Sequence, residues 1–126
     1  MLIAADSDIA IPVDFSRRLF DQFVRTPKRL VIIGGTGHDT FTDLCPAIRA
    51  LGGLTGLPLP FPPSFVELAD DGCIDEDFPA EQAWPIIQHF AVAHIRDAFG
   101  IDDEPVGLGP GIAGAFSTNV QYTDEP

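Results

Sequence analysis

Apolar residues gather in two short runs near the start of the chain, and each run predicts a buried strand. The first is Met1–Ala5 (MLIAA), and the second is Arg29–Gly34 (RLVIIG), which is β-branched in its middle. Continuous apolar strands of this kind belong to parallel sheets with helices on both faces. Between them, Pro12 is expected to open a helix, because proline fits a first helical turn. Residues 1–34 therefore indicate a βαβ unit.

Two amphipathic helices are expected from the 3.6-residue period. In the helix after Pro12, the spacing of Phe15, Leu19 and Phe23 puts these side chains on one face, with polar residues towards solvent. A long helix is expected from about Glu81 to Phe99. Its predicted apolar stripe consists of Trp84, Ile87, Ala91, Ile95 and Ala98.

The middle of the chain is expected to hold shorter helices and loops. Thr40 resembles the start of a capping box and predicts a helix that Pro46 kinks or divides before Gly52–Gly53 ends it. A proline-rich connector follows at residues 54–63. Ser64 and Glu67 then predict a single helical turn, and residues 70–77 an acidic loop.

The remaining tail, residues 101–126, is expected to be loop with one short strand near residues 117–122. The predicted fold class is therefore α/β, with two parallel strands, flanking helices and a loop-rich acidic C-terminal half. The chain has 126 residues, which suits a single domain over residues 1–126.

The charge of the chain argues against several classes of partner. The formal net charge is −12, and residues 64–126 hold 13 of the 19 acidic groups against one basic residue, Arg96. Such a surface repels phosphate backbones and anionic lipid, so neither a nucleic-acid nor a membrane partner is expected. The N-terminus has no basic region of the kind that begins a signal peptide. A cytoplasmic location is expected, with export of a longer precursor left open.

Candidate chemistry follows the two predicted strands. The first strand ends in a loop that contains Asp8, and the second ends in a glycine-rich turn that contains His38. Both loops should emerge at the carboxyl edge of a parallel sheet, where such sheets place their ligands. A carboxylate that accepts the imidazole Nδ1–H would leave Nε2 free to act as a general base. The structural alternatives are a helix N-terminal acid at Asp8 and an ordinary loop residue at His38.

The sequences Asp8-Ile9-Ala10-Ile11-Pro12 and Gly35-Thr36-Gly37-His38 carry a resemblance to a known family. The stretch over residues 1–50 resembles the last third of an α/β-hydrolase of the serine-esterase kind, as in dienelactone hydrolases, chlorophyllases and platelet-activating-factor acetylhydrolases. The resemblance implies a partial α/β-hydrolase fold, with Asp8 as the acid and His38 as the base of a Ser-His-Asp triad. It implies a small carboxylic ester as substrate and no cofactor.

The nucleophile of that family is missing from the chain. The family carries it on a G-x-S-x-G elbow upstream of the acid, whereas only seven residues precede Asp8 here and the motif occurs nowhere. We therefore expect the C-terminal part of a hydrolase that is inactive alone and needs an upstream half. The strand edge of Met1–Ala5 or Arg29–Gly34 would then be exposed, which favours a homodimer or a partner chain.

Two alternative functions stay open. One is a non-catalytic binding or interaction remnant of the hydrolase fold. Alternatively, Asp6 and Asp8 after a strand resemble the nucleophile motif of haloacid-dehalogenase-type phosphatases, with Thr36 as the phosphate-binding hydroxyl. In that case the magnesium acids would be Asp70 and Asp71, or Asp102 and Asp103. Otherwise no metal site is predicted, because His89 and His94 face different sides of one helix.

The sequence leaves open whether the two cysteines, Cys45 and Cys73, form a disulfide or are free thiols. A bridge between them is feasible if the connector doubles back, and exported hydrolases of the similar kind carry one. Closing a loop of this length would contribute about 3 kcal/mol. In a cytosolic protein both would instead be free thiols.

Overall fold

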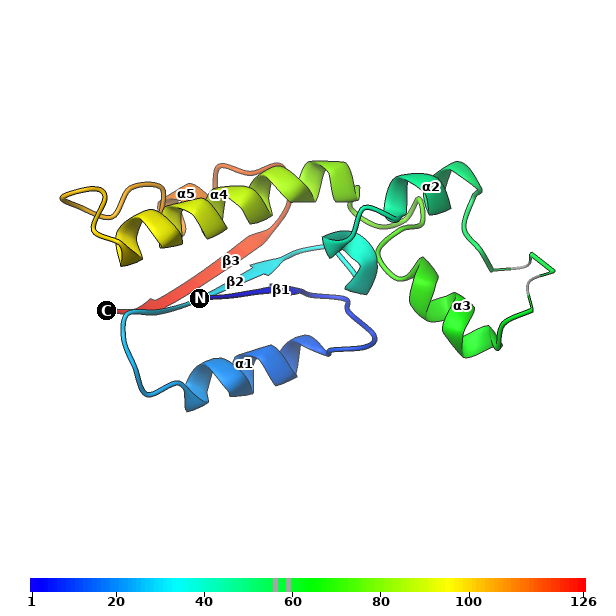
Figure 1. Cartoon of the computed structure of the whole chain (residues 1–126), viewed down its shortest axis with the longest axis horizontal. Coiled ribbons are helices and arrows are strands. Elements are labelled where there is room, and N and C mark those ends of the chain that lie inside the picture. The colour runs from blue at the N-terminus through cyan, green and yellow to red at the C-terminus, as the bar shows by residue number, and fades with distance from the viewer. Residues whose placement is uncertain (56, 59) are drawn as a thin grey trace.

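In the described residues, three strands form one mixed sheet with helices packed on both of its faces (Figure 1). The computed structural model describes residues 1–55, 57, 58 and 60–126. Along the chain the elements are β1 (Leu2–Ala5), α1 (Val13–Gln22), β2 (Lys28–Ile33), the 3-10 helix η1 (His38–Phe41), α2 (Cys45–Ala50), α3 (Pro63–Asp70), α4 (Ala80–Ala98), α5 (Pro110–Ala113) and β3 (Val120–Glu125).

The first three elements form the predicted unit of two parallel strands joined by a helix. β1 pairs with β2 in parallel, from Leu2 opposite Leu30 to Ala5 opposite Ile33. α1 crosses between them and starts directly after Pro12, which stands at its N-cap. The loops that follow β1 and β2 therefore leave the sheet at the same edge, which is the arrangement that the candidate site requires.

The sheet differs from the prediction of two parallel strands, because the tail supplies a third. β3 pairs antiparallel with β2 along its whole length, from Lys28 opposite Glu125 to Ile33 opposite Val120. β2 is therefore central, so of the two strand edges predicted as alternatives, the one at β1 is unpaired among the described residues and the one at β2 is not. Only Val120 and Tyr122 of β3 are partly buried. The short strand expected near residues 117–122 is therefore present, but it spans Val120–Glu125 and joins the sheet as an edge strand.

The alternation of side chains along β2 divides the core into two layers. Val31 and Ile33 point to one face and pack with Ile86 and Phe90 of α4. The alternate residues Leu30 and Ile32 point to the other face, where they meet Phe20 of α1. α1 and α4 thus lie on opposite sides of the sheet, as Figure 1 shows.

The predicted packing faces of both helices need correction. In α1 the buried residue is Phe20, whereas Phe15 is 51% exposed and Phe23 is 38% exposed. The helical spacing of these phenylalanines is real, but it does not specify which stripe meets the sheet. In α4 the predicted stripe is offset from the buried one, and Ile95 and Ala98 are exposed. The buried residues are Ala80, Ala83, Ile86, Phe90 and Ala93.

The region between the sheet and α4 is more helical than predicted. Thr40 does not start a long helix, because η1 stops at Phe41 and α2 begins afresh, with Pro46 in its first turn rather than at a kink. Gly52–Gly53 ends α2 with positive φ angles, as expected. α3 is longer than the single turn predicted at Ser64. The predicted connector includes positions 56 and 59, which lie outside the described residues.

A disulfide links α2 to the turn after α3. Cys45 and Cys73 are bonded to each other and fully buried, so of the two alternatives the structure contains the bridge. The bridge packs with Ile48 and Ala80 in a third, smaller core that Trp84 partly covers. It holds η1, α2 and the 70–73 turn together beyond the carboxyl ends of β1 and β2. Across the described residues, no helix is both long and apolar enough to cross a membrane.

Candidate functional site

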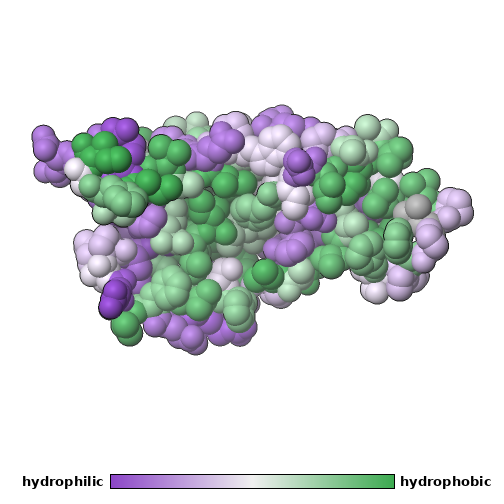
Figure 2. All heavy atoms as spheres, in the orientation of Figure 1, coloured by the Kyte–Doolittle hydropathy of each residue, from purple (hydrophilic) through white to green (hydrophobic). Residues whose placement is uncertain are grey.

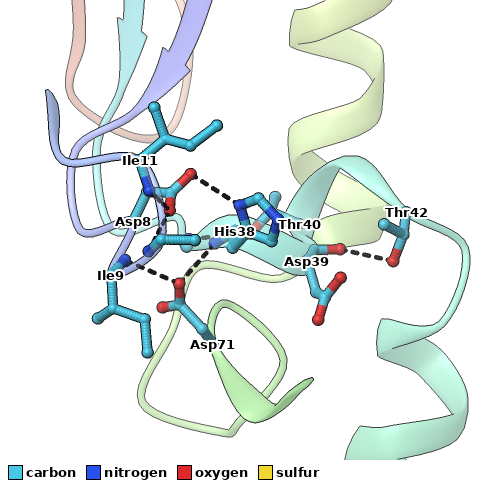
Figure 3. A network of polar contacts seen from close by, with 10 residues as sticks. Asp8, Ile9, Ile11, His38, Asp39, Thr40, Thr42 and Asp71 are labelled. Carbon is cyan, nitrogen blue, oxygen red and sulfur yellow. Dashed lines mark hydrogen bonds and ion pairs between the residues drawn. The ribbon is translucent and has the colours of Figure 1, made fainter. Parts of the chain in front are cut away.

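The loops after β1 and β2 bring Asp8 and His38 into contact. Oδ2 of Asp8 lies 3.1 Å from Nδ1 of His38, and the two side chains point toward each other in Figure 3. The Asp8 side chain is 8% exposed and that of His38 is 37% exposed. The structure therefore shields the carboxylate and leaves part of the imidazole open.

The two carboxylate oxygens of Asp8 have different hydrogen-bond partners. Oδ1 accepts the backbone N–H groups of Ala10 and Ile11 at 2.8 and 2.6 Å, which closes the loop around the side chain. Oδ2 is left for His38. Because an ionised carboxylate only accepts hydrogen bonds, the proton between them belongs to Nδ1 of His38. Nε2 then carries a lone pair and has no hydrogen bond to any described residue, as a general base requires.

A cavity of about 290 Å³ lies beside this pair. Ile3, Ala4 and Ala5 of β1 form one wall, so the cavity follows the open edge of the sheet. Ile11 and Phe41 add apolar surface, and they are 46% and 40% exposed. Figure 2 shows hydrophobic residues gathered over the middle of this face, between α1 and α4. The site is therefore an apolar hollow with one acid–histidine pair at its end.

Two further carboxylates, Asp71 and Asp39, surround the histidine turn. The sequence predicts Asp71 only as a candidate magnesium ligand and does not single out Asp39. Oδ2 of Asp71 accepts the backbone N–H of His38 at 2.9 Å. Asp39 follows His38 directly. Burial raises the pKa of the Asp39 carboxyl; the neighbouring His38 opposes this shift, and the charges of Asp71 and Asp8 add to it. The site is therefore strongly acidic around a single imidazole.

The residues of the phosphatase alternative do not assemble into a phosphate site. Thr36 is fully buried, and its hydroxyl donates to the carbonyl of Ile33 at 2.7 Å. Asp6 accepts the Gly35 N–H at 2.8 Å, which joins the two strand ends. Asp102 pairs with Arg96 near the end of α4. In the part of the chain that the structure describes, no three His, Cys, Asp or Glu side chains are arranged to hold a metal ion.

No serine of the described residues is hydrogen-bonded to His38, whose hydrogen-bond partners are Asp71 and Asp8. Ser16 lines the cavity, but among the described residues it has no hydrogen bond to His38. The Ser7 hydroxyl donates to Asp6 at 2.9 Å. The other two histidines are engaged elsewhere: His89 contacts the Gly107 carbonyl, and His94 contacts Arg29.

Comparisons with protein-family models, with curated proteins and with solved structures gave no match to this chain. The function is therefore argued from the geometry of the site.

Proposed function

We propose that this chain carries the acid and the histidine of a Ser-His-Asp triad, within a partial α/β-hydrolase fold of the serine-esterase kind. Asp8 orients the imidazole of His38, and His38 acts as general base on a serine that another chain segment supplies. The observation that carries this proposal is the 3.1 Å contact between Asp8 and His38 beside an open cavity. The chain alone lacks the nucleophile and is not an active esterase.

The reaction would use both states of the His38 ring. Nε2 takes the proton of the serine hydroxyl while the serine oxygen attacks the ester carbonyl carbon. The same proton passes to the alcohol oxygen as the ester C–O bond breaks, which leaves an acyl-serine. Water then loses a proton to Nε2 as its oxygen attacks the acyl carbon. Nε2 returns this proton to the serine oxygen as the acyl–serine bond breaks, which releases the carboxylic acid and restores the serine hydroxyl. Asp8 stabilises the imidazolium each time it forms, and its 8% exposure protects this interaction from solvent.

The open edge of β1 is the place where the missing segment would join. β1 is paired on one side only among the described residues, and its open edge borders the cavity that contains His38. A strand that pairs with this edge would carry its own following loop to the same side of the sheet. A serine on such a loop would approach Nε2 across the cavity. The apolar lining favours a small carboxylic ester as substrate.

The test uses the chain together with the coding region that precedes it in its genome. The joined protein should hydrolyse a p-nitrophenyl ester, and His38→Ala should reduce kcat roughly a thousandfold or more. His89→Ala is the matched control, because His89 lies outside the site and should leave kcat unchanged. An active protein that tolerates His38→Ala would overturn the proposal.

The second candidate is a non-catalytic binding module of the same fold. The observation that favours it is the absence of G-x-S-x-G from the chain, together with an apolar cavity and strand edge that remain able to bind. The absence of any serine elbow, in frame upstream or in a neighbouring gene, would favour this candidate over the triad.

A further inference from the structure

A single carboxylate connects the two loops of the site. Oδ2 of Asp71 accepts the N–H of Ile9 at 3.0 Å and the N–H of His38 at 2.9 Å. Ile9 follows Asp8 in the first loop, and His38 lies in the second. One oxygen therefore accepts an amide next to the acid and the amide of the histidine itself. Figure 3 shows Asp71 lying between these two backbones.

The backbone of Asp71 adds a third bond to the same region. Its carbonyl accepts the N–H of Asp39 at 2.9 Å, so consecutive amides of the histidine turn, from His38 and Asp39, both donate to one residue. Neither Ile9 nor His38 donates its amide to another described acceptor. The position of the Ile9 amide relative to the His38 amide therefore depends on Asp71.

Asp71 is itself held firmly in place. It follows the last residue of α3, and its N–H donates to the carbonyl of Leu68. Two residues later, Cys73 is bonded to Cys45. Hydrogen bonds to a carboxylate are also stronger than bonds to a neutral acceptor. Asp71 thus transmits the rigidity of α3 and the disulfide to the site.

We infer that Asp71 is a positioning residue, which sets the contact between Asp8 and His38 by holding the Ile9 and His38 amides on one oxygen. This inference rests on the proposed function of the pair. Without Asp71 the two loops keep the Asp8–His38 contact and two bonds on the strand side of the site, from the Ser7 N–H to the Thr36 carbonyl at 3.0 Å and from the Gly35 N–H to Asp6 at 2.8 Å. None of these bonds holds the Ile9 or His38 amide. The imidazole then spends less time in line with Asp8, and Nδ1 loses its preference for the proton.

The test reads the tautomer of His38 by nitrogen NMR of the intact chain at neutral pH. In the unmodified protein the Nδ1–H form should predominate. Asp71→Ala should reduce the ratio of the Nδ1–H form to the Nε2–H form by roughly fivefold, the scale of one hydrogen bond. Asp71→Asn keeps an oxygen that can accept both amides and should restore most of the ratio. Asp75→Ala removes an exposed carboxylate nearby and should change nothing.

Hydrogen exchange of the unmodified protein gives a measurement that needs no variant. The amides of Ile9 and His38 share one acceptor, so they should be protected from exchange to a similar degree. An unprotected Ile9 amide, or an unchanged tautomer ratio in folded Asp71→Ala, would overturn the inference. A predominant Nε2–H form in the unmodified protein would instead overturn the proposed triad role of Asp8, so the two failures are distinguishable.

Discussion

Gly37 and Gly72 pack backbone against backbone beneath the candidate site. A Cβ on Gly72 would lie 2.8 Å from the amide nitrogen of Gly37, and a Cβ on Gly37 would overlap the amide nitrogen of Gly72. Gly37 immediately precedes His38, and Gly72 immediately follows Asp71. This close approach lets the carboxylate of Asp71 reach the histidine turn. The site therefore requires glycine at both positions, because a side chain on either would separate the two backbones.

Gly37→Ala should destabilise the protein by about 2 kcal/mol or more, because a methyl group would be forced into the backbone of the 70–73 turn. Its φ angle of −116° suits alanine, so the cost is steric rather than conformational. Gly111→Ala in α5 is the matched control: no atom lies within 4 Å of its added Cβ, and stability should change little. Urea unfolding of both variants measures the difference, and equal midpoints would contradict the prediction.

The isolated chain should not hydrolyse p-nitrophenyl esters faster than its His38→Ala variant. The reason is that no described serine is hydrogen-bonded to His38, so there is no activated oxygen to form an acyl intermediate. Stopped-flow assays should show no burst of nitrophenol. A fluorophosphonate probe should label no serine, and labelling of Ser16 would show that the cavity contains a nucleophile after all.

Reduction of the Cys45–Cys73 bridge should lower the free energy of unfolding by about 3 to 4 kcal/mol, as expected for a loop closed across a sequence separation of 28. Urea unfolding with and without a thiol reductant measures the change. The Cys45→Ala, Cys73→Ala double variant serves as control, because reductant should not affect its midpoint. A wild-type midpoint that is insensitive to complete reduction would contradict the expected contribution.

Asp70 should make stability depend on pH in the acid range. Burial opposes the charge of this carboxylate, but hydrogen bonds from the Thr55 hydroxyl and from the amides of Leu54 and Thr55 outweigh burial and hold its pKa below the ordinary 3.8. The folded state therefore binds this proton less readily than the unfolded state does. Its contribution is complete above pH 3.8 and is lost as the pH falls through the lowered pKa.

The Asp70→Asn variant tests this dependence. It should be less stable than the wild type at neutral pH, and the difference should narrow as the pH falls below about 4. Asp75→Asn, which changes an exposed carboxylate in the same segment, should follow the wild-type profile. If the free energy of unfolding changed with pH in the same way for the wild type and for Asp70→Asn, the pH dependence could not be due to Asp70.

The open edge of β1 should make the chain associate with itself or with an upstream segment. Unpaired backbone groups and the apolar surface of Ile11 and Phe41 favour an added strand there. Sedimentation should show a concentration-dependent dimer, which Phe41→Glu weakens about tenfold or more, on the scale of one buried aromatic contact. Phe99→Glu, at the exposed end of α4, is the control. A monomer at every concentration, which no upstream segment stabilises, would contradict the prediction.

The sequence by itself determined the parts of the fold that depend on local pattern. The apolar runs before Asp8 and before His38 are strands, buried along the whole of β2 and in part along β1, and continuous apolar character predicts such strands directly. Parallel pairing of those strands then brings the two following loops to one edge. The contact between Asp8 and His38 could therefore be anticipated across 30 positions of sequence.

Only the tertiary structure decided which surfaces meet. β3 is an edge strand with few inward residues, so the sequence pattern does not predict that it pairs with β2. α4 carries apolar residues on most sides, and the sheet selects the side with Ile86 and Phe90 rather than the side with Ile95. Asp71 accepts hydrogen bonds from amides 33 and 62 positions away. The periodicity of a sequence does not indicate which distant backbone group a carboxylate will contact. Such contacts arise from the packing of whole elements, which a local pattern does not encode.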